Sequence, residues 1–365
     1  MKCNCDRVTL NEALSATSSV IASRTPKPIL QCVRLTAEQD ALTLTAYDQE
    51  VGLRYRVRQV EVTNTGDTLV PGDRLLAIVR ESQDETLAFE TEDDVLHVRG
   101  RDSHFQVVGQ NIREFPPVPD MEGEPDFAVH VGELRAAVER TVFAAARENT
   151  RYAINGVLWQ KSDKKLQLVA TDGRRLALSI ASLEKSGKED VSAIVPIKPL
   201  SLLTRLHFDA GELLEVRLST NQIVMRTERA TISSVLVEGR FPKWEDVLPH
   251  DLDKKFTLPT SEFLSGVTRA ALLASMESKG IRMHLRDKKM TLSSRSPEQG
   301  EATIELEVPE YSGGELLISF NPEFLRDALK VCEPDVTFEL KEGAKPGVLT
   351  SGPKFKYVVM PVNLS

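Results

Sequence analysis

The chain has 365 residues, with 46 lysines and arginines against 54 aspartates and glutamates, so its formal net charge is −8. Hydrophobic residues make up 41% and charged residues 27% of it, which is ordinary for a globular protein and argues against a disordered, collagen-like or disulfide-scaffold chain. No apolar run approaches the ~20 residues of a membrane-spanning helix, and the N-terminus lacks the apolar core of a signal peptide. The composition therefore predicts a cytoplasmic protein of roughly two to three domains.

An internal repeat organises the chain. Three segments alternate apolar and polar residues as half-buried strands do, and they begin at Leu42, Leu166 and Met290, spaced 124 residues apart. A stretch with helical spacing precedes each strand and a second one follows it. The predicted helices cover residues 9–24, 73–80, 132–147, 198–206, 261–275 and 322–330. Thr9 and Glu12 have the spacing of a capping box at the start of the first helix.

The ends of the repeats also correspond. Phe115-Pro116 and Phe241-Pro242 lie 126 residues apart, and the third counterpart is the terminal strand at 357–361. Proline-rich segments follow the first two pairs and mark linkers. The sequence therefore predicts an α+β fold of three domains, 1–124, 125–252 and 253–365, each with two helices packed on antiparallel sheets.

The six helical windows carry a summed charge of +4, which leaves −12 for the rest of the chain. If the helices share a face, that face is mildly basic and suits loose contact with a phosphate backbone. Random variation among helical charges would also give a sum of this size, so charge alone does not decide the function.

Enzyme chemistry has little support in the sequence. Cys3 and Cys5 form a C-x-C pair without a second pair or histidine at zinc spacing, and Cys32 and Cys332 are remote. The six histidines are dispersed, and no glycine-rich phosphate loop occurs. Asp172-Gly173, followed by two arginines, could be read as a phosphoryl site, but its repeat counterpart at Asp48 has no such neighbours. We therefore expect no catalytic residue, no metal and no cofactor.

Several motifs spread over the chain carry a family resemblance. They are Ser23–Pro26 with Pro28–Leu30, Arg151–Val157, Ala170–Ala177, Gly239–Pro242 with Val247–Pro249, and Tyr357–Pro361. With these motifs the chain resembles, over essentially its whole length, the beta subunits of bacterial DNA polymerase III, the sliding clamps. The resemblance implies a head-to-tail homodimer that closes a ring, a DNA replication factor of the polymerase holoenzyme that encircles duplex DNA without catalysing a reaction.

The resemblance also implies a cleft between the second and third domains. There the replicative polymerase, the clamp loader and other DNA polymerases and repair proteins dock short peptides with apolar anchors, of the Gln-Leu-x-Leu-Phe type. The implied lining is Ile154, Thr171, Gly173, Arg174, Arg175, Leu176, Pro242, Val247, Asn321, Phe324, Val358, Met360 and Pro361. Arg175 would orient the peptide, although Ile154, Leu176 and Val358 alone would read as ordinary core residues. The chain departs from the family pattern at Asp246, Val362 and Asn363, which affects the expected peptide preference.

For DNA the resemblance points to Arg24, Arg74, Arg147, Arg151 and Tyr152, which would contact phosphate and sugar without reading bases. Asp73, where the family commonly has a basic residue, weakens one contact. A solvated helix face remains the alternative for any single arginine.

At the subunit interface the resemblance pairs an edge strand of the first domain with the third domain. Arg101, His104 and Phe105 would face Leu272 and Leu273, and Glu298 and Glu301 would supply the opposite charge. Alternatively, the apolar residues among them are core.

A second hypothesis from a different class is a repeat-built adaptor that binds only protein peptides. It differs from the clamp in that it need not dimerise into a ring. A hydrolase is a distant third.

Overall fold

The structure is a computed structural model that describes residues 1–21, 24–148, 152–274 and 280–363. Its described residues contain two α-helices for each sequence repeat, and all named strand pairs are antiparallel. The helices are α1 (Arg7–Ser18), α2 (Gly72–Glu81), α3 (Val131–Glu139), α4 (Ile197–Arg205), α5 (Thr260–Ala271) and α6 (Pro322–Leu329). This confirms the predicted α+β class, although the first helix of each repeat is shorter than predicted.

The chain forms two compact units. Unit 1 consists of Met1–Gly132, Glu184–Glu189 and Lys198–Leu236, and unit 2 of Glu133–Leu183, Asp190–Ile197 and Val237–Ser365. The predicted middle domain contributes to both units, because one of its sheets continues into strands of the first repeat and the other into strands of the third.

Unit 1 contains a five-stranded and a nine-stranded sheet. The five-stranded sheet has the order β5 (Val60–Asn64), β1 (Lys2–Asp6), β7 (Thr86–Glu92), β8 (Val95–Arg99) and β9 (His104–Val108). The nine-stranded sheet has the order β14 (Lys185–Ser186), β10 (Phe127–His130), β16 (Leu213–Leu218), β17 (Gln222–Arg226), β18 (Ala230–Val235), β4 (Val51–Val57), β3 (Leu42–Tyr47), β2 (Cys32–Ala37) and β6 (Gly66–Pro71). Helix α1 packs against α2, β3 and β4.

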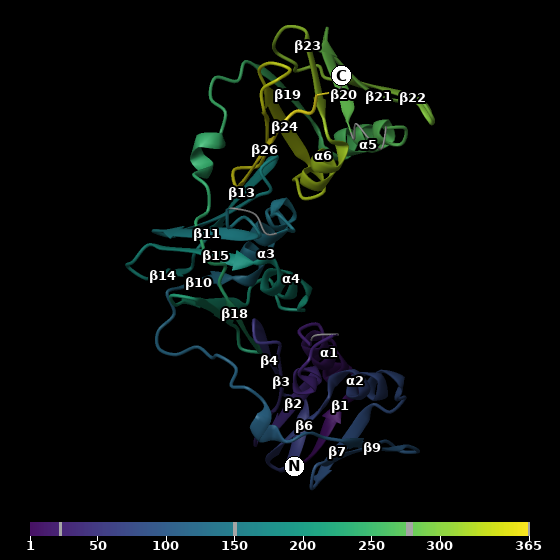
Figure 1. Cartoon of the computed structure of the whole chain (residues 1–365), viewed down its shortest axis with the longest axis vertical. Helices are drawn as coiled ribbons and strands as arrows, with labels where there is room; N and C mark the ends of the chain where they lie inside the picture. Colours follow the sequence, from purple (N-terminus) through teal and green to yellow (C-terminus); the bar gives the residue numbers. More distant parts are fainter. Residues whose placement is uncertain (22–23, 149–151, 275–279, 364–365) are drawn as a thin grey trace. The chain divides into compact units, whose positions relative to one another are not determined.

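Unit 2 contains an eight-stranded and a four-stranded sheet. The eight-stranded sheet has the order β15 (Val191–Pro196), β11 (Gly156–Ser162), β12 (Lys165–Thr171), β13 (Arg175–Ser182), β26 (Phe355–Val359), β25 (Gly347–Ser351), β24 (Asp335–Leu340) and β19 (Lys254–Pro259). The four-stranded sheet has the order β22 (Gly300–Glu307), β21 (Lys289–Ser296), β20 (Ile281–Arg286) and β23 (Leu316–Phe320). Figure 1 shows β26, near the end of the chain, beside β13 from the middle of it.

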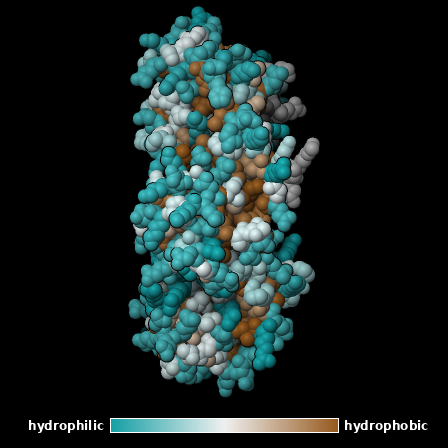
Figure 2. All heavy atoms as spheres, turned by 90° about the vertical axis from the view of Figure 1, so that its left-hand side faces the viewer, coloured by the Kyte–Doolittle hydropathy of each residue, from teal (hydrophilic) through white to brown (hydrophobic). Residues whose placement is uncertain are grey.

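The three strands that defined the repeat are β3, β12 and β21. Their inward residues Leu42, Leu166 and Met290 are fully buried, as the alternating pattern predicts. In unit 2 the rings of Phe256, Phe263 and Phe338 pack with centroids 5.7 to 6.2 Å apart and extend the core. On the face shown in Figure 2 hydrophilic side chains predominate, and apolar ones emerge in limited areas.

The start of helix α1 differs from the prediction. Its N-cap is Asp6, whose carboxylate accepts hydrogen bonds from the backbone N–H and the hydroxyl of Thr9, both at 2.9 Å. The bond from the Thr9 backbone lowers the pKa of Asp6. Thr9 and Glu12 therefore form no capping box, because β1 leads directly into the helix and places a better acceptor three residues earlier.

Candidate functional site

A cavity of about 210 Å³ opens in unit 2 beside the seam between β13 and β26. Its lining is mostly apolar and consists of Tyr152, Ile154, Thr171, Gly173, Arg174, Arg175, Leu176, Pro242, Trp244, Val247, Val358 and Met360. The volume is below the ~300 to 1,000 Å³ of sites that enclose a drug-sized ligand, but exceeds an engineered 150 Å³ cavity that binds benzene. The cavity is therefore sized for apolar side chains and not for a whole small-molecule substrate.

Most residues of the predicted cleft line this cavity, but three do not. Asn321 caps helix α6 by accepting a hydrogen bond from the backbone N–H of Glu323 at 2.9 Å. The ring of Phe324 lies 4.4 Å from the guanidinium carbon of Arg175 and supports that side chain. Pro361 follows the last lining residue and is half-buried.

The cavity exists because two distant strands pair. In the β13–β26 ladder Leu176 is opposite Val358, and both side chains are 1% exposed. Both residues thus belong to the core and also line the cavity, so the two alternatives given for them from the sequence, core residue and cleft residue, both hold. Met360 and Val247, 40% and 45% exposed, supply apolar surface that is open to solvent.

The turn between β12 and β13 forms one side of the cavity. Gly173 has a φ of +85°, a conformation that side chains disfavour. Its backbone N–H donates to the hydroxyl oxygen of Thr171 at 3.1 Å, and the Asp172 carboxylate accepts from the N–H groups of Arg174 and Arg175 at 3.0 and 3.1 Å. Asp172 thus holds a turn, which accounts for the motif without phosphoryl chemistry.

The guanidinium of Arg175 donates a hydrogen bond inside the protein from each of its nitrogens. It donates to Asp172 at 2.9 Å, to Asp327 of α6 at 2.8 Å and to the backbone carbonyl oxygen of Phe143 at 2.9 Å. Its carbon also lies 5.5 Å from the centroid of the Phe143 ring. The side chain links the turn to α6 and to the 3-10 turn η3 (Val142–Ala144), and it also lines the cavity.

Tyr357 of β26 reinforces the same region. Burial raises the pKa of its hydroxyl, which therefore stays protonated and donates to the backbone carbonyl oxygen of Phe324 at 2.9 Å. This bond fixes the backbone of α6 at Phe324, the residue whose ring lies against Arg175.

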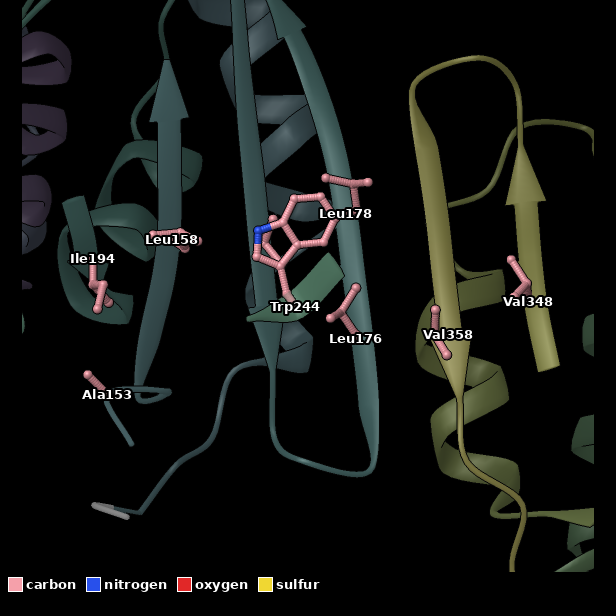
Figure 3. Close-up of a cluster of buried hydrophobic side chains, with 9 residues drawn as sticks. Ala153, Leu158, Leu176, Leu178, Ile194, Trp244, Val348 and Val358 are labelled. Carbon is pink, nitrogen blue, oxygen red and sulfur yellow. The ribbon is translucent and has the colours of Figure 1, made fainter. Parts of the chain in front are cut away.

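Trp244 lines the cavity but was absent from the predicted cleft. It begins the 3-10 turn η4 (Trp244–Val247), in which residues three apart lie on one side, so Trp244 and Val247 both face the cavity. The indole is 6% exposed and donates to the side-chain carbonyl oxygen of Gln160 at 3.1 Å. Figure 3 shows its ring among Leu158, Leu176 and Leu178. The sequence does contain a signal for Trp244, because it is a large apolar residue between Lys243 and Glu245 in a polar linker.

The chain end closes another side. The backbone N–H of Met360 donates to the carbonyl oxygen of Arg174 at 2.9 Å, and that of Val362 to Ser319 at 2.8 Å. Of the positions where the chain departs from the family pattern, Asp246 and Asn363 are exposed and Val362 is half-buried.

The residues predicted to contact DNA are distributed over both units. Arg24 and Arg74 are exposed in unit 1, and Arg147 is exposed in unit 2. The carboxylate of Asp73 accepts from the backbone N–H of Arg74 at 2.8 Å in the first turn of α2. Tyr152, 54% exposed, lines the cavity as well. Arg151 lies outside the described residues.

The predicted interface residues lie on or near two edge strands. In unit 1, β9 is an edge strand that carries His104 and Phe105, with Arg101 exposed just before it. In unit 2, β22 is an edge strand that carries Glu301, and Glu298 is exposed in the preceding turn. The backbone groups of such edges are available for pairing with another chain.

The apolar members of this set are not core residues. Phe105 is 39% and Leu272 is 72% exposed, and Leu273 is half-buried just after α5. The Glu301 carboxylate is 2.9 Å from the guanidinium of Arg295, also exposed. His104 accepts or donates a 3.0 Å hydrogen bond with His97 on β8.

The described ranges of the chain hold no group of three or more histidine, cysteine or acidic side chains that could bind a metal ion. Cys3 and Cys5 share a face of β1 with their sulfurs 3.8 Å apart, and their mutual hydrogen bond and burial raise the pKa of Cys5. Over the same ranges, no helix is long and apolar enough to cross a membrane.

Comparison with known proteins agrees with this architecture over the whole chain. Residues 1–119 match the N-terminal domain of the DNA polymerase III beta subunit, residues 128–243 its central domain and residues 245–363 its C-terminal domain. The beta sliding clamp of Pseudomonas aeruginosa is 32% identical over 362 residues, with 98% of each chain covered, and that of Caulobacter vibrioides is 30% identical with 100% of each covered.

Solved structures of sliding clamps also match the fold of the chain. A P. aeruginosa sliding clamp bound to griselimycin superposes with a TM-score of 0.94 at 31% identity, and covers 100% of both chains. The Bacillus subtilis clamp has the same TM-score and coverage at 24% identity, which supports the fold alone. By these matches to all three domains, the chain belongs to the family of the DNA polymerase III beta subunit.

Proposed function

We propose that the protein is a DNA sliding clamp, a non-catalytic processivity subunit that acts in the cytoplasm. The observation that carries this function is the threefold repeat of a two-helix, antiparallel-sheet domain in a chain that belongs to the beta subunit family. The domains are 1–124, 125–252 and 253–365. A repeat of this kind presents equivalent helices at regular intervals, which suits a surface that must follow a duplex without reading its sequence.

Two chains close the ring head to tail through the edge strands β9 and β22. A heterologous contact of this kind uses a different surface on each partner and closes only at a suitable rotation. Exposed Phe105 meets Leu272 and Leu273, while Arg101 and His104 lie opposite the acidic Glu298 and Glu301. Apolar burial supplies the association free energy, and the charges set register.

DNA is held loosely inside the ring. Arg24, Arg74, Arg147, Arg151 and Tyr152 contact phosphate and sugar, and none reads a base. Each base-specific bidentate contact would cost ~1 to 3 kcal/mol to break at every step, so retention of a sliding ring must be topological.

The cavity of unit 2 is the partner site. It takes the apolar side chains of a short peptide carried by the replicative polymerase, the clamp loader and other DNA polymerases and repair proteins. Desolvation of a leucine or phenylalanine contributes ~1.5 to 3 kcal/mol, enough to make one anchor important for binding.

Retention on DNA tests the ring. Once placed on nicked circular DNA by its clamp loader, the protein should survive a wash in high salt and leave when the circle is cut. Electrostatic binding responds to salt and not to DNA ends. Equal loss from circles and linear molecules would rule out topological binding.

The peptide-only adaptor is the competing function, and sedimentation separates the two. The wild type should be a dimer, and Leu272→Asp with Leu273→Asp should give folded monomers, because a charge buried among apolar contacts disfavours association. A wild-type chain that stays monomeric at micromolar concentration would favour the adaptor.

A further inference from the structure

Trp244 differs from the other walls of the cavity because it is both large and fixed in orientation. Met360 can repack, since an unbranched thioether adapts its shape to a neighbour. The indole of Trp244 cannot do so without breaking its 3.1 Å bond to Gln160 and leaving a poorly exposed donor unsatisfied.

Packing behind the ring removes the remaining freedom. The indole belongs to a buried cluster with Leu158, Leu176, Leu178 and Val358, drawn from three strands of one sheet. Gln160, its hydrogen-bond acceptor, lies on β11 within the same sheet. Interiors packed in this way resist displacement of a side chain by even one methylene group. The wall therefore cannot retreat from a bulky ligand.

We propose that Trp244, held by Gln160, sets the size of the anchor side chain that the cavity accepts, so that the site favours leucine-sized anchors and rejects the bulkiest ring, that of tryptophan. This inference rests on the proposed peptide site and adds which size of anchor side chain that site selects. Discrimination arises from steric exclusion of the larger side chain as well as from contacts to the smaller one.

The test compares three fluorescein-labelled pentapeptides, Gln-Leu-Ser-Leu-X with leucine, phenylalanine or tryptophan as X, by fluorescence anisotropy on the full chain. The wild type should bind the leucine peptide at least tenfold more tightly than the tryptophan peptide. Trp244→Leu enlarges the cavity, and the ratio should fall to twofold or less, or invert. Gln160→Leu keeps the ring but frees it, so the ratio should fall by a smaller factor.

Trp159→Phe is the matched control. Trp159 is 1% exposed on β11, next to Gln160 in sequence, but it does not line the cavity. Its replacement should leave the leucine-to-tryptophan ratio unchanged. Circular dichroism and retained binding of the leucine peptide establish that each variant is folded.

The outcomes separate the two levels of the argument. If no peptide binds the wild type, the proposed partner site itself is wrong. If the peptides bind but the wild type does not discriminate, or if Trp244→Leu and Gln160→Leu both keep the wild-type ratio, the site stands and the role of Trp244 is refuted.

Discussion

Each unit contains a pair of strands from two different repeats, which we call a seam. The two seams are equivalent in the repeat, but different residues cover them. In unit 2, β13 pairs with β26 and Leu176 is opposite Val358; in unit 1, β4 pairs with β18 in the corresponding register, and Gly52 is opposite Ser233. The turns before β4 and β13 also correspond, since Gln49 has a φ of +79° where its counterpart Gly173 has +85°. The repeat therefore reproduces the seam down to a backbone conformation.

The linker that follows each repeat makes the difference. In unit 1, Val118 lies very close to Gly52. A Cβ added to Gly52 would be 2.5 Å from a methyl group of Val118. Arg54 donates to the carbonyl oxygens of Val118 and Pro119 at 2.5 and 2.8 Å and holds the linker on the seam. In unit 2 the counterpart of Arg54 is apolar Leu178 and the counterpart of Gly52 is Leu176. There the linker packs on both leucines through the indole of Trp244, which forms one wall of the cavity.

The contrast shows how one repeated fold gives its two seams different surfaces. In unit 1 the linker lies directly on the seam, because Arg54 donates to its backbone and Gly52 leaves room for it. In the other seam two leucines occupy the same places and pack against the indole of Trp244, and the cavity lies beside that ring.

Arg175→Ala should have the largest effect. It leaves Asp172 and Asp327 without their partner and frees the turn from α6, so we expect a loss of about 3 kcal/mol of stability in unit 2 and at least a tenfold loss of peptide affinity. Both tryptophans, Trp159 and Trp244, lie in unit 2, so urea unfolding followed by their fluorescence reports this unit. A loss of stability below about 1 kcal/mol would show that the hydrogen bonds of Arg175 do not stabilise unit 2 as expected.

Gly52→Ala should have the next largest effect. The added methyl group overlaps Val118 and the Ser233 hydroxyl, at 2.5 and 2.6 Å, which should cost about 2 kcal/mol. The linker should lift, and residues 115–121 should become sensitive to protease. A linker as resistant as in the wild type would mean that its closeness to Gly52 does not hold it in place.

Arg54→Ala is the control in unit 1 for the Arg175 change, because it also removes an arginine that donates to backbone carbonyl oxygens. It removes hydrogen bonds to two linker carbonyl groups and should cost about 1 to 2 kcal/mol, seen as faster amide exchange in the linker of unit 1. Peptide affinity should stay within twofold of wild type, because the side chain is in the other unit. A large loss of peptide binding would contradict the division of roles between the seams.

The smallest effects come from the two turns. Gly173→Ala places a methyl group where nothing lies within 4 Å, so its cost of about 1 kcal/mol is purely that of the positive φ. Gln49→Gly relieves the same strain in unit 1 and should stabilise it by about 0.5 kcal/mol. Denaturant midpoints compare the two, and shifts of the same sign would contradict the equivalence of the turns.

Periodicity and spacing predicted much of this. The 124-residue spacing located the strands at Leu42, Leu166 and Met290, because alternation along a half-buried strand is a local property. The family resemblance, carried by motifs such as Ala170–Ala177 and Tyr357–Pro361, implied most of the cavity lining. The partners of Arg175 were beyond such reasoning, since Phe143 and Asp327 are 32 and 152 residues away in the chain. The helix cap at Asp6 was missed because a strand runs directly into the helix, and only the fold reveals that junction.

Hydrogen exchange with and without a saturating Gln-Leu-Ser-Leu-Phe peptide observes both seams in one experiment, and so it shows directly which of them binds a partner. With peptide bound, we expect slower exchange at residues 171–176, 242–247 and 358–360 in unit 2. We expect unchanged exchange at residues 47–52 and 115–121 in unit 1. Protection confined to unit 1, or spread equally over both seams, would contradict the claim that only the seam beside Trp244 is open to a partner.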